Sequence, residues 1–175
     1  MLFGNLFKKK KKEISKTLFG ERVLSRMLLT SGKKCPELLE ELGANVSFTN
    51  YLLYMQYHLF LAGKILEQRY TVADVELISN ATINGLIDFI DSIPSEKKAE
   101  AKKMLHEMYQ EVSDYAEGIC SDFGSENGLK SLANAFIEDC GASKGLLSNM
   151  LVFTHFSEFI IYHTSDVLND EIVLV

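Results

Sequence analysis

The sequence is poor in the residues that make turns and corners. Its 175 residues include two prolines, Pro36 and Pro94, 11 glycines and no tryptophan. A sandwich or barrel of many short strands needs a turn at every corner, so these all-β architectures are excluded. The apolar fraction of 47% and the charged fraction of 24% are ordinary for a folded chain, which excludes disordered and low-complexity classes. One helical domain remains.

Cysteine is also scarce, with only Cys35, Cys120 and Cys140. The number is odd and the three residues lie far apart in the sequence, so they form neither a paired-thiol redox motif nor a zinc knuckle. The opening apolar stretch, residues 1–7, is too short for a secretory signal, and lysines follow it rather than precede it. We therefore expect free, partly buried thiols in a reducing cytoplasm.

Apolar residues recur at steps of three and four along most of the chain, which is the spacing of one helix face. Segments 47–70 and 143–168 are apolar on most sides, as expected of two central helices. Ser31-Gly32, Gly43, Pro94 and Gly141 are expected to end helices, and Thr71 to cap the start of one. The prediction is all-α: a single-domain bundle of about six to seven helices, the others covering 13–29, 36–42, 71–93, 96–120 and 129–140.

Either apolar segment could instead be read as a membrane span. A spanning helix needs about 20 residues with few charges. The first segment contains Gln56, His58 and Lys64, and the second contains His155 and Glu158. These polar residues favour two helices that are covered by other helices.

Positive and negative charges are separated along the chain. Residues 1 to 34 hold ten of the 18 Lys and Arg residues but two of the 24 Asp and Glu residues, which gives a net charge of +8. The rest of the chain therefore carries −14, and the whole chain −6. We divide the chain into a basic amphipathic head, residues 1–12, and an acidic helical-bundle domain, residues 13–175.

The head combines apolar residues at helical spacing with a run of lysines. This combination is typical of a peripheral anchor on an anionic membrane surface, where each lysine contributes about 1 kcal/mol. The alternative is that the two phenylalanines pack on the domain and the lysines stay in water or face acidic helices. Nucleic acid is not favoured as a partner because the domain itself is acidic. The residues predicted to dock are Leu2, Phe3, Leu6, Phe7, Lys8, Lys9, Lys10, Lys11 and Lys12.

The histidines offer a second candidate site. His58 falls within the first central segment, and His155 and Glu158 share one face of the last one. If these two helices face each other, the three side chains could line a ligand pocket or, together with His163, hold a metal ion. However, di-metal helical bundles use Glu-x-x-His, which this chain lacks. The simpler interpretation is a hydrogen-bonded core histidine with a glutamate at the solvent edge.

The first functional hypothesis is a non-enzymatic cytoplasmic regulatory protein that binds another protein, with the head docking it to an anionic surface. The alternative is a sensor, a small-ligand or metal-binding bundle with a pocket near His58, His155 and Glu158. Catalysis is the least favoured, because no nucleophile or acid–base pair is specified by spacing. No cofactor is predicted. Apolar surface residues on a bundle favour a homodimer.

Overall fold

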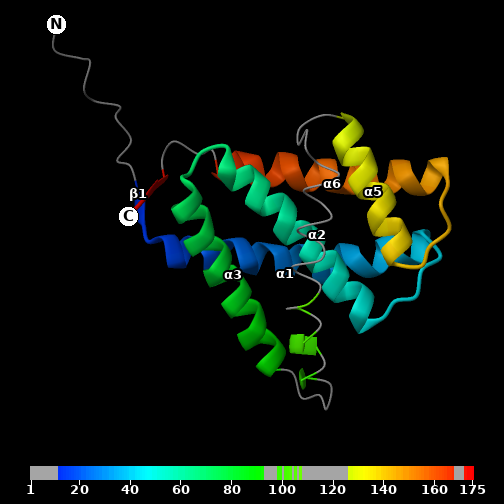
Figure 1. Ribbon diagram of the computed structural model, residues 1–175, viewed down its shortest axis with the longest axis horizontal. Helices are drawn as coiled ribbons and strands as arrows, with labels where there is room; N and C mark the ends of the chain where they lie inside the picture. The colour runs from blue at the N-terminus through cyan, green and yellow to red at the C-terminus, as the bar shows by residue number, and fades with distance from the viewer. Residues whose placement is uncertain are drawn as a thin grey trace, which may run out of the picture.

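The computed structural model describes residues 12–92, 98–99, 101–103, 105, 107, 126–167 and 172–175, and these form an all-α bundle (Figure 1). The described residues between 98 and 107 are helical. The predicted class of fold, a multi-helix bundle, is therefore confirmed. In chain order the elements are β1 (Lys12–Ile14), α1 (Lys16–Glu41), α2 (Phe48–Glu67), α3 (Val72–Ser92), α5 (Glu126–Asp139), α6 (Leu146–Val167) and β2 (Ile172–Leu174).

Helix α2 is the centre of the bundle. Fourteen of its 20 residues are buried, and it contacts α1, α3, α5 and α6. The hydroxyl of Ser47 caps its start by accepting from the amide of Asn50 at 3.1 Å. A helix without a polar face is stable only when neighbours cover it on every side, as the sequence predicted for this segment.

Helix α1 is one continuous helix, and the predicted break at Ser31-Gly32 is wrong. Pro36 lies inside this helix, and no short separate helix begins there. The core explains the continuity, because Met27, Cys35 and Leu39 are buried along one stripe that crosses the predicted break. Packing of that stripe outweighs the local preference for a turn. The predicted end at Gly43 is confirmed, since Gly43 has φ +66° just after the helix.

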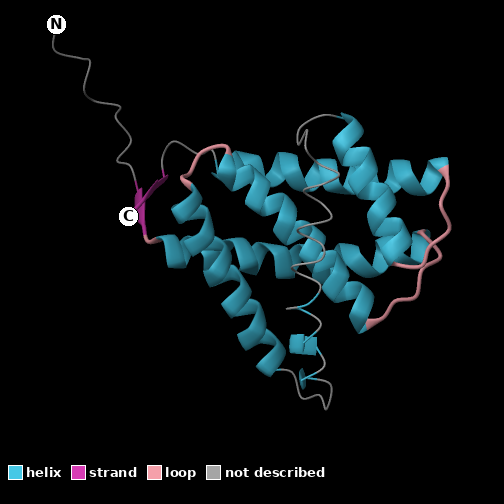
Figure 2. Cartoon of the chain, in the orientation of Figure 1, coloured by secondary structure: helices cyan, strands magenta, loops and turns pink. Residues whose placement is uncertain are grey.

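The start of α1 also differs from the prediction of a helix from residue 13. Ser15 caps the helix by accepting from the amide of Leu18 at 3.2 Å, so the helix begins at Lys16. The preceding residues form β1, which pairs in parallel with β2 at the other end of the chain (Figure 2). This pairing was not predicted from the sequence, because each strand has three residues and its partner is remote in the sequence.

Helices α1 and α3 approach each other closely at two glycines. A Cβ atom on Gly20 would lie 2.7 Å from the carbonyl oxygen of Ile78, and one on Gly85 would lie 2.5 Å from Leu24 Cδ2. The hydroxyl of Thr82 donates to the carbonyl of Gly20 at 3.1 Å. The absence of a side chain at Gly20 therefore sets the distance between these helices. Thr71 caps α3 as predicted, accepting from the amide of Asp74 at 3.3 Å.

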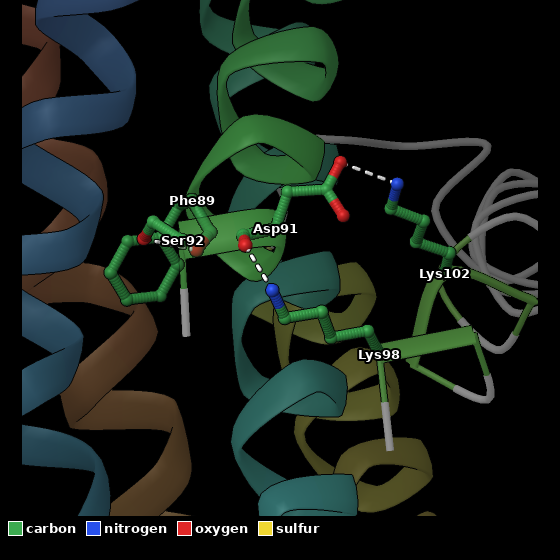
Figure 3. A network of polar contacts seen from close by, with 5 residues as sticks. All are labelled: Phe89, Asp91, Ser92, Lys98 and Lys102. Carbon is green, nitrogen blue, oxygen red and sulfur yellow. Dashed lines mark hydrogen bonds and ion pairs between the residues drawn. The ribbon is translucent and has the colours of Figure 1, made fainter. Parts of the chain in front are cut away.

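The helical residues after α3 are held to its C-terminal end by ionic contacts (Figure 3). Lys102 Nζ lies 2.5 Å from a carboxylate oxygen of Asp91, and Lys98 Nζ contacts the carbonyl oxygen of Asp91. The contact from Lys98 also satisfies one of the carbonyl groups that the end of a helix leaves open. Leu105 is buried, and its carbonyl accepts from Gln56 of α2 at 3.2 Å. These contacts attach the segment to the core.

Helix α6 is less enclosed than its apolar composition predicts. It buries one stripe containing Val152, Phe156 and Phe159 against α2 and α5. Leu146 and Leu147 at its start are 78% and 82% exposed. Figure 1 shows α1 and α6 both running along the long axis of the molecule, with α2 crossing obliquely. Within the described residues, no helix has the length and apolar character that a membrane crossing requires.

Candidate functional site

Helices α1, α2 and α6 enclose a cavity that opens to solvent. Its volume is about 690 Å³, which lies within the range of small-molecule binding sites. Five lining residues come from α1, two from α2 and five from α6. They are Arg26, Leu29, Thr30, Lys33, Lys34, Tyr54, His58, His155, Glu158, Phe159, Ile161 and Tyr162.

Helical spacing explains why these residues meet. The other four lining residues of α1 lie three, four, seven and eight positions after Arg26. This spacing places all five on one face of the helix. Tyr54 and His58 are four residues apart on α2, and His155 and Glu158 are three apart on α6. Three helix faces therefore converge on one cavity, and every lining residue in the described part of the chain belongs to a helix.

Aromatic side chains form the inner part of the cavity. Tyr54, His58 and Phe159 are 1%, 2% and 5% exposed. The rings of Tyr54 and His58 stack at 3.9 Å between centroids, and Phe159 meets His58 edge-on at 4.4 Å. His58 Nδ1 lies 2.7 Å from the carbonyl oxygen of Tyr54. A carbonyl oxygen only accepts, so Nδ1 carries the proton and donates it.

Some buried polar atoms at this cavity lack a hydrogen-bond partner among the described residues. They include the Tyr54 hydroxyl oxygen and His155 Nε2. Burial raises the pKa of Tyr54, which keeps the phenol protonated. Burial also lowers the pKa of His155, and the nearby Lys34 lowers it further, which favours the neutral imidazole. The inner cavity therefore presents neutral groups that can hydrogen-bond, and leaving them unpaired costs free energy.

The rim of the cavity is cationic and apolar. Arg26, Lys33 and Lys34 supply positive charge, and Glu158 supplies the single carboxylate among the lining residues that the structure describes. Lys34 Nζ lies 2.7 Å from Glu158 Oε2, and this ion pair holds the pKa of Glu158 below its ordinary value. Around these charges, Leu29, Ile161 and Tyr162 are 78%, 72% and 67% exposed, a concentration of apolar surface at the opening.

A second, smaller cavity of about 410 Å³ lies between α2 and α3. Its charged lining residues include Lys64 and Glu67, which form an ion pair at 3.1 Å. Among the described residues, none that lines this second cavity has a buried polar atom without a hydrogen-bond partner. The cavity between α1, α2 and α6 is therefore the better candidate for a binding site.

The structure brings together three residues that the sequence singled out, His58, His155 and Glu158. His58 is a hydrogen-bonded core residue and Glu158 is exposed, yet both line the cavity. Within the described residues, no group of three or more His, Cys, Asp or Glu side chains could hold a metal ion. The side chain of His163 lies outside the described residues.

The predicted docking head lies almost entirely outside the described residues. Residues 1–11 are not described, and Lys12 enters the described part of the chain as the first residue of β1. Of the cysteines, Cys35 and Cys140 are free and buried, and burial raises the pKa of each thiol to about 12. Cys120 lies outside the described residues.

The cationic residues of this cavity and Tyr54 were not predicted as site residues from the sequence. Arg26, Lys33 and Lys34 were counted only as part of the basic N-terminal region. The predicted break at Ser31-Gly32 separated Arg26 from the lysines, so their shared helix face was hidden. The continued spacing of apolar residues through Cys35 and Leu39 was the signal that could have joined them.

Comparison with protein families, curated proteins and solved structures finds no match for this chain.

Proposed function

We propose that this protein is a non-enzymatic helical protein that binds a small organic molecule in the cavity between α1, α2 and α6. The observation that carries the proposal is the pair of buried polar atoms, Tyr54 Oη and His155 Nε2, that line a cavity of about 690 Å³ without a hydrogen-bond partner among the described residues. Folded proteins pair more than nine in ten of their buried polar groups. A bound molecule that supplies partners explains why these atoms are tolerated.

The shape and composition of the cavity support binding of an organic ligand. Three helices, rather than mobile loops, present the lining side chains, so the cavity exists before the ligand arrives. Tyr54, His58 and Phe159 provide aromatic surface against which an apolar ligand can pack.

Binding is favoured over catalysis because the carboxylate of Glu158 is held in an ion pair. Glu158 is paired with Lys34 at 2.7 Å, and its lowered pKa makes it a poor proton carrier near neutral pH. A general acid or base would need a pKa closer to the working pH.

The proposal is tested by fluorescence titration with Nile red, a neutral aromatic dye that brightens in apolar sites. The variant Thr30→Trp places a large side chain into the cavity from α1. We expect it to weaken dye binding at least tenfold. The control Ser25→Trp adds the same side chain to an exposed position of α1 that does not line the cavity, and should bind dye as the wild type does.

Circular dichroism establishes that both variants keep the helical fold. Equal dye affinity for folded wild type and folded Thr30→Trp would overturn the proposal, because the dye would then bind elsewhere.

The protein-binding hypothesis of the sequence analysis stays a prediction. All but one of the residues on which its docking step depends lie in segment 1–11, outside the described residues; the exception is Lys12.

A further inference from the structure

We propose, building on the ligand-binding function proposed above, that the ligand is an amphipathic anion. Its apolar body lies among Tyr54, His58 and Phe159, and its carboxylate or phosphate group lies at the rim formed by Arg26, Lys33 and Lys34. The proposal rests on the way polarity and charge change from the inner cavity to the opening.

The inner cavity is suited to an apolar body rather than to a charge. Its rings are almost fully buried, and its free hydrogen-bonding atoms belong to a phenol and an imidazole rather than to ions. An ion placed there would lose its hydration without meeting an opposite charge, which is costly. A carbon skeleton gains from leaving water, and a neutral oxygen on it can bond to Tyr54 or His155.

The rim is suited to an anion. Lys34 is paired with Glu158, whereas Lys33 has no ion-pair partner in the described part of the chain. Arg26 and Lys33 are two helical turns apart, about 10 Å along the α1 axis. Their charges therefore line one side of the opening, where an anionic group can reach either of them.

The charge of the rim is opposite to that of most of the chain. Residues 35 to 175 carry a net charge of −14, yet cations outnumber carboxylates among the described residues that line this cavity. Clefts lined by one sign of charge concentrate ligands of the opposite sign. The net negative charge of residues 35 to 175 disfavours anions in general, so the cationic rim is what would attract one to this cavity.

The ion pair between Lys34 and Glu158 leads to a further prediction about the affinity of the cavity for an anion. An incoming anion competes with Glu158 for the ammonium group of Lys34, and the carboxylate also repels it. Removal of the carboxylate should therefore strengthen the binding of an anion and leave a neutral ligand of the same length unaffected.

The test is displacement of bound Nile red by decanoate, decyl phosphate and decanol, which share one chain length and differ in the head group. Titrations are run at low salt and below the micellar concentration of each competitor. We expect at least one of the two anions to displace the dye at a concentration at least tenfold lower than decanol does. The order of decanoate and decyl phosphate identifies the preferred head group.

Three variants assign the effect to the rim. Lys33→Gln should reduce the preference for the anion over decanol about threefold to fivefold, and Glu158→Gln should increase it. Arg22→Gln removes a charge from an exposed position of α1 outside the cavity and should leave the preference unchanged. High salt should reduce the preference, because exposed charges are screened.

Two results would overturn the inference while the cavity still bound the dye. Decanol could displace the dye as efficiently as both anions do, or the preference for the anion could be unchanged in Lys33→Gln. Failure of the proposed function would give a different result, because the dye would then bind Thr30→Trp as tightly as it binds the wild type. The two failures are therefore distinguishable.

Discussion

Two tyrosines on α2 show how individual residues divide between stability and binding. Tyr57 donates its hydroxyl proton to Asp139 Oδ2 at 2.6 Å, and Tyr54, one turn earlier, has no hydrogen-bond partner for its hydroxyl among the described residues. Both side chains are at most 1% exposed. The phenol hydroxyl therefore has a hydrogen-bond partner on one side of α2, and on the side that lines the cavity it has none among the described residues.

This contrast predicts opposite effects of the same substitution. Tyr54→Phe removes a buried unpaired hydroxyl, so the free energy of unfolding of the ligand-free protein should rise by about 1 kcal/mol. Tyr57→Phe removes a hydrogen bond to a carboxylate and should lower it by about 2 kcal/mol. Urea unfolding followed by circular dichroism measures both. A loss of stability in Tyr54→Phe comparable to that in Tyr57→Phe would show that the Tyr54 hydroxyl is already satisfied in the free protein.

At the scale of the element, helix α1 both packs against α3 and lines the cavity. Its first half packs closely on α3 at Gly20, and the stretch from Arg26 to Lys34 lines the cavity. The continuous helix keeps Arg26 and Lys34 on one face across Gly32. A break at Gly32 would separate the cations of the rim.

Two glycines of α1 therefore respond differently to the same change. Gly32 has open space where a Cβ would be added and no positive φ, so Gly32→Ala should raise the free energy of unfolding by about 0.5–1 kcal/mol through helix propensity. At Gly20 a Cβ would lie 2.7 Å from the carbonyl oxygen of Ile78 and 2.8 Å from Ala81 Cβ. Gly20→Ala should lower the free energy of unfolding by about 1–3 kcal/mol, because α3 must move away.

Thermal and urea unfolding of the two variants, side by side, provide the measurement. Stabilisation of similar size in both would contradict the close approach of α1 and α3.

At the scale of the whole molecule, the main feature is the separation of charge. The first 34 residues carry +8 and the rest carries −14. The cavity rim uses the last cations of the basic region, Arg26, Lys33 and Lys34, and leaves the lysine run of residues 8–12 for another role. Docking of that run to an anionic surface stays a prediction of the sequence.

The prediction is testable with vesicles that contain phosphatidylserine. Replacement of Lys8 to Lys12 by glutamine should abolish sedimentation with these vesicles at physiological salt, because each lysine near an anionic surface contributes about 1 kcal/mol. A control variant with the exposed residues Lys103, Lys130 and Lys144 changed to glutamine lowers the positive charge of the domain and should sediment as the wild type does. Sedimentation that survives the change at Lys8 to Lys12 would remove the anchoring role.

Part of this structure was predictable because it depends on local pattern. The apolar surface of the α2 segment required burial on all sides, Thr71 capped α3, and Gly43 and Gly141 adopt the positive φ that follows a helix end. Each of these features is decided by residues within a few positions of one another.

Tertiary structure decided the rest. Ser31-Gly32 is a turn signal on its own, but burial of Cys35 and Leu39 in the shared core keeps α1 helical through it. β1 and β2 pair across almost the whole length of the chain. A cavity arises where three helix faces fail to fill the space between them, and that depends on helix positions rather than on any one helix.

The sequence by itself therefore determined the helical class of the fold and which faces of α2 and α3 are buried, because both follow from the spacing of apolar residues along one helix. It also nominated His58, His155 and Glu158 on the condition that their helices meet. Only the packing of α1, α2 and α6 brought those residues together with the Tyr54 hydroxyl and a cationic rim. The reason is physical: contacts between remote segments depend on how the helices fit against each other as solid bodies.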